Sequence, residues 1–131
     1  MLRTLDLKEW AEDQNPPEAL SVVSMDTWPD DVANVLMLRL TGGLGLEGGE
    51  ETLDRPTFTA QVRAGGRTPG LTAETLGWWF DEAWINGPPV FEIGGFHVVG
   101  KGRLGGPPSY AFTDDFKRVY RAATYWCRIE R

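Results

Sequence analysis

The most constraining feature of the sequence is a strict alternation of polar and apolar side chains over residues 57–64, Thr-Phe-Thr-Ala-Gln-Val-Arg-Ala. Successive side chains of a β-strand point to opposite faces, so this pattern predicts a half-buried strand. Its even-numbered residues would face a core, and its odd-numbered residues, which end with Arg63, would face solvent. Pro56 precedes the run and Gly65-Gly66 follows it, which limits the strand to this length.

A second periodicity predicts an amphipathic helix over residues 72–86. Thr72 is suited to cap its N-terminus, and Leu71 and Leu76 have the spacing of a hydrophobic staple. Gly87 and the two prolines after it are expected to end the helix. One stripe of side chains on this helix would face the core: Leu76, Phe80, Ala83 and Trp84.

Trp78 and Ile85 would lie on a second flank of the same helix. Six tryptophans in 131 residues are a high number for a small domain. A second apolar flank is usually covered by a partner, which makes Trp78 and Ile85 candidate interface residues. The alternative, cover by the N-terminal helix or by a loop, is equally consistent with the sequence.

The remaining apolar patterns predict a short N-terminal helix and several short strands. Thr4 or Asp6 would cap the helix. Residues 118–130 fit helical spacing as well as strand parity, and their aromatic and β-branched content favours a long strand. The other expected elements are a helix over 2–11, a short edge strand at 22–23, and strands over 34–40, 90–93 and 96–100.

Five of the 16 glycines lie between residues 42 and 49. Glycine is unfavourable inside a helix or strand, so residues 42–54 are predicted to form a long flexible loop. The sum of the expected elements is one α+β domain over residues 1–131. Its fold would be a mostly antiparallel or mixed β-sheet flanked by helices on one side.

The formal net charge of −6 is unevenly distributed. Residues 1–54 hold 12 acidic and 3 basic side chains, whereas residues 55–131 hold 7 acidic and 10 basic. An acidic chain is a poor candidate for tight nucleic-acid binding. The asymmetry favours a molecule with two faces of opposite charge, and a solvated acidic surface is the alternative.

The motifs that suggest chemistry lack the context that the chemistry needs. Residues 100–105 and 43–48 match a dinucleotide-binding glycine pattern, but no expected helix follows either one directly. Residues 95–101 resemble a phosphate loop without the hydroxyl that would hold Mg²⁺. His97 and Cys127 are the only residues of their kinds, and no third catalytic group accompanies them. We therefore expect no enzyme, no metal and no cofactor, and no run approaches the roughly 20 apolar residues that span a membrane.

The order of these features resembles the tail terminator and minor capsid proteins of long-tailed bacteriophages. The resemblance lies in Asp54-Arg55-Pro56 before the strand 57–65, in the helix 73–84, in Pro107-Pro108, and in Asp114-Asp115 with Arg118 before the closing strand. It implies a structural α/β subunit that closes into a ring, usually hexameric, on the tail tube. Such a ring stops tube polymerisation and joins the tail to the head connector.

The resemblance also implies partners and a location. The expected partners are further copies of the chain, the major tail tube protein and the head–tail connector or stopper protein, with DNA passing through the lumen without specific binding. The protein would be assembled in the host cytoplasm and reside in the tail or neck of the virion. A head-side connector or tail completion protein is the alternative within this class, and a small ligand-binding or enzyme domain is the alternative outside it.

A ring uses heterologous contacts, in which one patch meets a different patch on the neighbour. The basic residues expected at or near the ring or tube interface are Arg55, Arg63, Arg67, Lys101 and Arg103.

Overall fold

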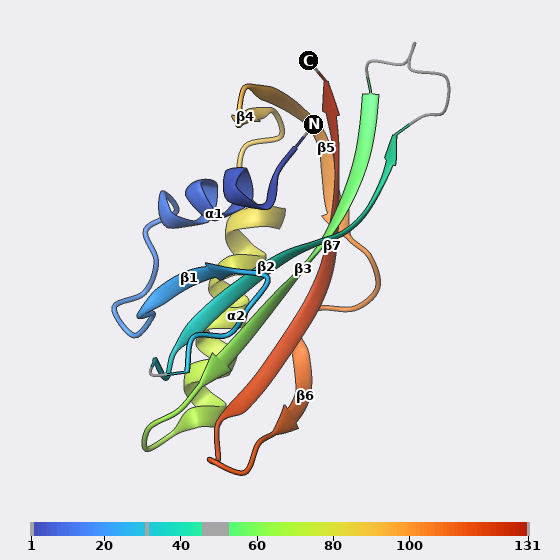
Figure 1. The fold of residues 1–131 in the computed structure, drawn as a ribbon. Helices are drawn as coiled ribbons and strands as arrows, with labels where there is room; N and C mark the ends of the chain where they lie inside the picture. Colours follow the sequence, from blue (N-terminus) through green and yellow to red (C-terminus); the bar gives the residue numbers. More distant parts are fainter. Residues whose placement is uncertain (1, 31, 46–52, 131) are drawn as a thin grey trace.

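The computed structural model describes residues 2–30, 32–45 and 53–130 (Figure 1). It contains helices α1 (Thr4–Glu12) and α2 (Pro69–Ile85). Its strands are β1 (Val22–Met25), β2 (Val35–Gly45), β3 (Leu53–Ala64), β4 (Phe91–Ile93), β5 (Phe96–Arg103), β6 (Ser109–Thr113) and β7 (Val119–Glu130).

The strands form one mixed sheet in the order β1-β2-β3-β7-β5-β4, and β6 pairs with β7 beside β5. Only β1 and β2 run parallel among the pairs of the described residues. Both helices pack on one face of this sheet, because Trp10 of α1 lies edge-on against Phe80 and Trp84 of α2. The sequence-based expectation of an α+β domain is confirmed at this level.

The core lies between this face and the helices. Phe58 of β3 and Tyr125 of β7 stack with ring centroids 5.5 Å apart, and Trp84 meets Phe58 edge-on at 5.0 Å. The alternation over 57–64 places the even-numbered residues in the core as predicted. Arg63 departs from the prediction: it is only 2% exposed, because Trp28, Pro29 and Val32 cover the opposite face of the sheet at its position.

The glycine-rich stretch is strand rather than loop over the residues that the structure describes. Gly42, Gly43 and Gly45 pair with Thr57, Pro56 and Asp54 in an antiparallel ladder. The ladder hydrogen bonds compensate the conformational entropy that glycine loses, and a Cβ at Gly42 would meet Thr57 Oγ1 at 3.0 Å. The predicted loop is therefore wrong at 42–45 and 53–54, while residues 46–52 lie outside the described part of the chain.

Helix α2 begins three residues before the expected N-cap. Thr68 is the N-cap and Pro69 occupies the first turn, where its fixed φ suits a helix and its missing N–H costs nothing. Leu71 is 64% exposed, so the predicted hydrophobic staple is wrong. The predicted core stripe is confirmed at Leu76, Phe80 and Trp84, which are buried.

Helix α1 is capped by a residue that the sequence did not indicate. Arg3 is the N-cap, and its backbone N–H donates to Asp6 Oδ2 at 2.8 Å. Asp6 therefore occupies the third position of the helix and Thr4 lies inside it, so the prediction that one of these two residues caps the helix is wrong. The hydrogen bond from the Arg3 side chain is the main cause of the lowered pKa of Asp6.

The C-terminal part of the chain contains two strands, β6 and β7. Residues 119–130 form strand β7, which confirms the strand interpretation of this segment. Strand β6 was missed, because its five residues are all exposed and give no alternating pattern. The hairpin at Gly94-Gly95 is confirmed, and both glycines have positive φ.

Candidate functional site

The face of the sheet opposite the helices carries a groove with two arginines. Tyr125 and Cys127 of β7 face the core, so Trp126 and Arg128 point to the opposite face. Together with Arg55 and Thr57 of β3 and with Leu104, they line a hollow of about 370 Å³. We call this hollow the arginine groove.

Two glycines of β5 make room for the indole of the arginine groove. Gly102 pairs with Trp126 across the β5–β7 ladder. A Cβ at Gly102 would lie 2.6 Å from Trp126 Nε1, and one at Gly100 would lie 3.5 Å from the same ring. The ring therefore lies directly over the β5 backbone, which fixes it as one wall of the groove.

The charges of the arginine groove are not matched within the described part of the chain. Arg55 is exposed, and neither Arg55 nor Arg128 forms an ion pair with a described residue. The buried Nε of Arg128 has no hydrogen-bond partner among those residues. Guanidinium groups bind carboxylates through paired hydrogen bonds, so the groove is suited to an acidic ligand.

A second groove lies on the helix side of the molecule, between α1 and the β4–β5 hairpin. Its volume is about 410 Å³. Glu9, Asp13 and Glu92 are its exposed carboxylates, and Trp10 and Phe91 form its apolar wall with ring centroids 5.8 Å apart. Its other lining residues include Asp6 and no lysine or arginine. We call it the acidic groove.

The predicted interface residues divide into an exposed and an internal group. Arg55 and Arg67 are exposed, and Trp78 is 42% exposed with the Arg103 guanidinium 6.0 Å from its ring. Ile85 is half-buried and packs against the core. Only Arg55 of this set lines either groove.

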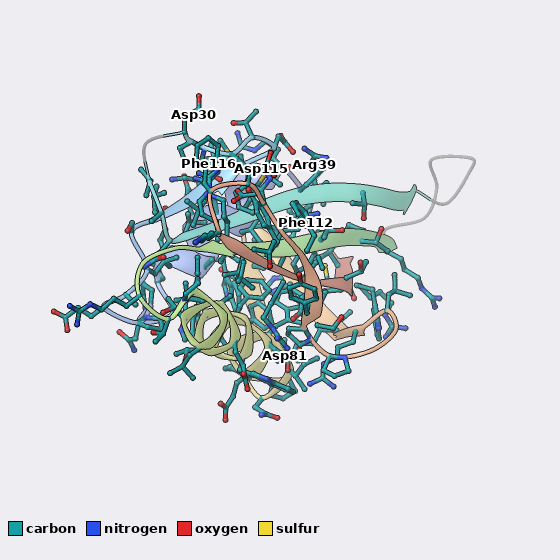
Figure 2. The ribbon with its side chains drawn as sticks, turned by 90° about the horizontal axis from the view of Figure 1, so that it is seen from below. Asp30, Arg39, Asp81, Phe112, Asp115 and Phe116 are labelled. Atoms are coloured by element: carbon teal, nitrogen blue, oxygen red, sulfur yellow. The ribbon has the colours of Figure 1, made fainter. Side chains whose placement is uncertain are left out.

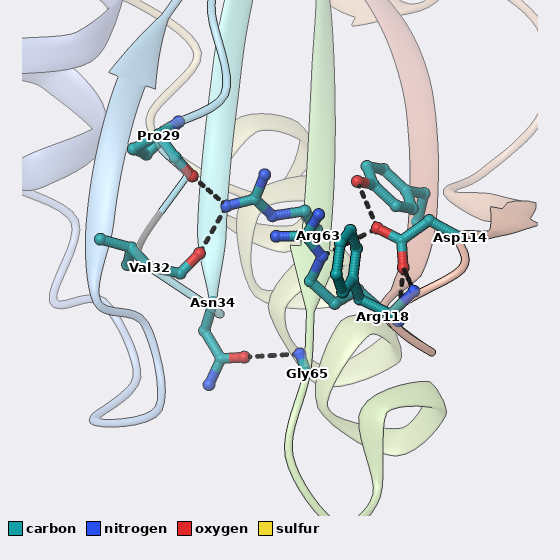
Figure 3. A network of polar contacts seen from close by, with 9 residues as sticks. Pro29, Val32, Asn34, Arg63, Gly65, Asp114 and Arg118 are labelled. Carbon is teal, nitrogen blue, oxygen red and sulfur yellow. Dashed lines mark hydrogen bonds and ion pairs between the residues drawn. The ribbon is translucent and has the colours of Figure 1, made fainter.

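Arg63 holds a loop instead of facing a partner (Figure 3). Its Nη2 donates to the backbone carbonyls of Pro29 and Val32, and its guanidinium lies 5.2 Å from the Trp28 ring. The chain between β1 and β2 is thereby fixed against β3.

The carboxylate of Asp114 orders the turn before β7 (Figure 3). Asp114 accepts hydrogen bonds from the backbone N–H groups of Phe116 and Arg118, from Arg118 Nε at 2.8 Å and from the Tyr120 hydroxyl at 2.9 Å. Partial burial alone would raise the pKa of Asp114, but these hydrogen bonds outweigh it and lower the pKa to about 2.

Lys101 and Arg103 also act inside the fold, where both connect β5 to α2. Lys101 Nζ donates to the carbonyls of Trp84 at 2.5 Å and Gly87 at 3.0 Å, and burial lowers its pKa. A cation at this end of a helix offsets the negative end of the dipole. Arg103 donates to both carboxylate oxygens of buried Asp81, which also accepts from the Tyr125 hydroxyl at 3.0 Å.

The residues considered for nucleophilic catalysis lie on opposite faces of the sheet. His97 is exposed and lies 3.5 Å from Glu92 through Nδ1. Cys127 is buried in the core, and burial raises the pKa of its thiol to about 12. The two therefore do not form a nucleophile–base pair.

No three histidine, cysteine, aspartate or glutamate side chains of the described residues are placed to hold a metal ion. Neither of the two described helices is long and apolar enough to cross a membrane.

Exposed aromatic side chains gather at β6 and the turn after it. Tyr110, Phe112 and Phe116 are 57%, 51% and 79% exposed. Figure 2 shows Phe116 and Asp115 on the side of the molecule away from α2 and Asp81. Phe112 stacks on Tyr120 with centroids 4.1 Å apart, so its ring is held in place at the edge of the sheet.

Two comparisons with known proteins give no family for this chain, so the function has to be inferred from the structure. A scan of the chain against protein-family models finds no match, and a search of curated proteins finds no relative.

Proposed function

We propose that the chain is a structural subunit of a long-tailed bacteriophage that assembles head to tail with copies of itself into a ring. The ring, expected to be a hexamer, would cap the tail tube, end its polymerisation and join the tail to the head connector. DNA would pass through its lumen without specific binding.

The observation that carries this proposal is that the sheet has an unpaired edge on both sides. Strand β1 pairs with β2 only over Val35–Leu38, so in the described structure β2 is paired on one side alone from Arg39 to Gly45. Strand β6 pairs only with β7 among the described strands. An unpaired edge offers backbone N–H and C=O groups to another strand, and proteins that stay monomeric usually protect such edges.

The two edges differ, which favours a ring over a two-fold dimer. The β6 edge bears the exposed Tyr110 and Phe112, whereas the β2 edge is rich in glycine. When two unlike patches meet, one copy keeps its β2 edge free and the other keeps its β6 edge free. Further copies can therefore add at both ends, and only a closed ring leaves no edge free.

The proposal is tested by measuring assembly directly. Native mass spectrometry and negative-stain microscopy of the chain, alone and with tail-tube protein, are expected to show a ring and capped tubes of defined length. Capped tubes would also separate a terminator from a head-side connector. A chain that stays monomeric in both conditions and leaves tube length unchanged would refute the proposal.

A matched pair of variants locates the contact. Tyr110→Ser changes a residue that is 57% exposed on the β6 edge, and Leu71→Ser changes one that is 64% exposed on α2, away from both edges. We expect Tyr110→Ser to weaken ring formation and Leu71→Ser to leave it intact.

A further inference from the structure

We propose that the arginine groove of one copy binds the acidic groove of the next copy, and that this contact sets the head-to-tail direction of assembly. This inference rests on the proposed function, since it adds a contact between grooves to the contact between sheet edges of neighbouring copies. It is carried by the charges, the aromatic linings and the positions of the two grooves.

The arginine groove holds two like charges that face each other. Arg55 and Arg128 lie between the paired residues Asp54–Ile129 and Thr57–Trp126 of the β3–β7 ladder, so they are cross-strand neighbours on one face. Like charges in this position destabilise a sheet. A carboxylate between the two guanidinium groups would remove this repulsion, which is a reason for the groove to bind an anion.

The acidic groove presents carboxylates with a matching arrangement. Glu9 and Asp13 are four residues apart at the end of α1, so their side chains are neighbours on one face of the helix. Glu92 adds a third carboxylate from the β4–β5 hairpin. Two neighbouring carboxylates can therefore meet two neighbouring arginines.

Both grooves also have an aromatic wall. Trp126 and the 50% exposed Leu104 border the arginine groove, and half-buried Trp10 and Phe91 border the acidic one. Interfaces commonly place aromatic and apolar groups at the centre and charges around them. The charges would then select the partner and its orientation more than they would add affinity.

A chain cannot fill its own arginine groove with its own acidic groove. The acidic groove lies on the helix side of the sheet and the arginine groove lies on the opposite face. The occupant must then come from another molecule, and a second copy supplies the complementary surface at equal concentration. A nucleic acid is a poorer occupant, because the groove offers two arginines and the chain has a net charge of −6.

Charge reversal with cross-rescue tests the contact. The variant Arg55→Glu/Arg128→Glu makes both grooves negative, and Glu9→Lys/Asp13→Lys/Glu92→Lys, which replaces all three exposed carboxylates of the acidic groove, makes both positive. We expect each variant alone to self-associate about tenfold or more weakly than the unchanged chain. An equimolar mixture is expected to regain assembly, because every contact between the two variants again joins opposite charges.

The controls separate charge from folding. Arg67→Glu makes the same change in net charge as Arg55→Glu, at an exposed residue outside both grooves and both sheet edges, and its assembly is expected to stay within about threefold of the unchanged chain. Circular dichroism reports whether each variant folds. Arg55→Glu alone, at an exposed residue, replaces the double variant if Arg128→Glu does not fold.

The outcomes distinguish this inference from the proposed function. If the unchanged chain forms rings and the reversal variants form them equally well, the groove contact is wrong and the ring proposal stands. If the variants fail and their mixture fails as well, an acidic segment of another protein becomes the better occupant. A chain that is monomeric alone and with tail-tube protein overturns both proposals.

Discussion

Replacing Arg63 by methionine tests whether this arginine holds the fold together or serves an interface. Methionine keeps the length and much of the volume of the side chain while removing its charge and its donors. In the structure Arg63 is 2% exposed and donates to the carbonyls of Pro29 and Val32. Because these contacts lie within one chain, we expect the variant to lose stability even as a monomer.

The magnitude follows from the contacts that are lost. Hydrogen bonds from a charged donor are worth about 1.5–3 kcal/mol each, and the contact with Trp28 adds about 1 kcal/mol. Removing a buried guanidinium whose Nε has no partner among the described residues returns part of this sum. We therefore expect a net destabilisation of about 2–4 kcal/mol.

Urea unfolding monitored by tryptophan fluorescence measures the change, and Trp28 is a local probe 5.2 Å from the Arg63 guanidinium. With a urea dependence of about 2 kcal/mol/M, in the middle of the usual range, the midpoint should fall by roughly 1–2 M. Arg67→Met is the control at an exposed arginine, with an expected change within about 0.5 kcal/mol. Equal stability of the Arg63 and Arg67 variants, with assembly lost only for Arg63, would refute the reasoning and return Arg63 to the interface.

Three further predictions concern single residues of the fold. The pKa of Asp114 is about 2 in the fold and near its ordinary 3.8 in the unfolded chain. Its contribution to the free energy of unfolding is therefore present above pH 4 and is lost as pH falls toward 2. Asp114→Asn should flatten the dependence of stability on pH over this range, as measured by urea unfolding at each pH. Gly102→Ala should cost about 1–3 kcal/mol, because its Cβ would lie 2.6 Å from Trp126 Nε1, whereas Gly106→Ala, with nothing within 4 Å, should cost far less in the same assay. Cys127, the only cysteine, should react with a thiol reagent only when the chain opens, since it is buried and its pKa is raised to about 12; rapid labelling of the native protein would contradict its place in the core.

Much of the fold could be predicted from periodicity, because burial and periodicity are directly linked in strands and helices. The strand over 57–64 and the core stripe of α2 are examples. The predictions failed where another segment changed the environment of a residue. Arg63 has the parity of a solvent-facing residue, but Trp28, Pro29 and Val32 lie over it. Gly42 and Gly43 have the composition of a loop, but β3 supplies a ladder partner for each.

The arginine groove was predicted only at Arg55. Its other members, Trp126 and Arg128, come from β7, whose register against β3 and β5 is a long-range property. One partial signal was present in the sequence: Gly100 ends the strand predicted over 96–100 and Gly102 lies two residues later, and glycine in a strand often marks the close approach of a large group. The acidic groove had no such signal, since it joins α1 to a hairpin about 80 residues later.

The structure shows which of the unevenly distributed charges remain free to bind a partner. Arg63, Lys101, Arg103 and Arg118 donate to groups of their own chain, so the excess of basic residues after position 54 does not make a broad basic face. Glu9, Glu12, Asp13 and Glu18, by contrast, are all exposed. The described part of the fold thus leaves several exposed acidic side chains in and after α1 and few unmatched arginines, of which two share one groove. A partner attracted by opposite charge would meet the basic side at few places. For this reason we expect assembly to depend far more on Arg55 and Arg128 than on Arg67.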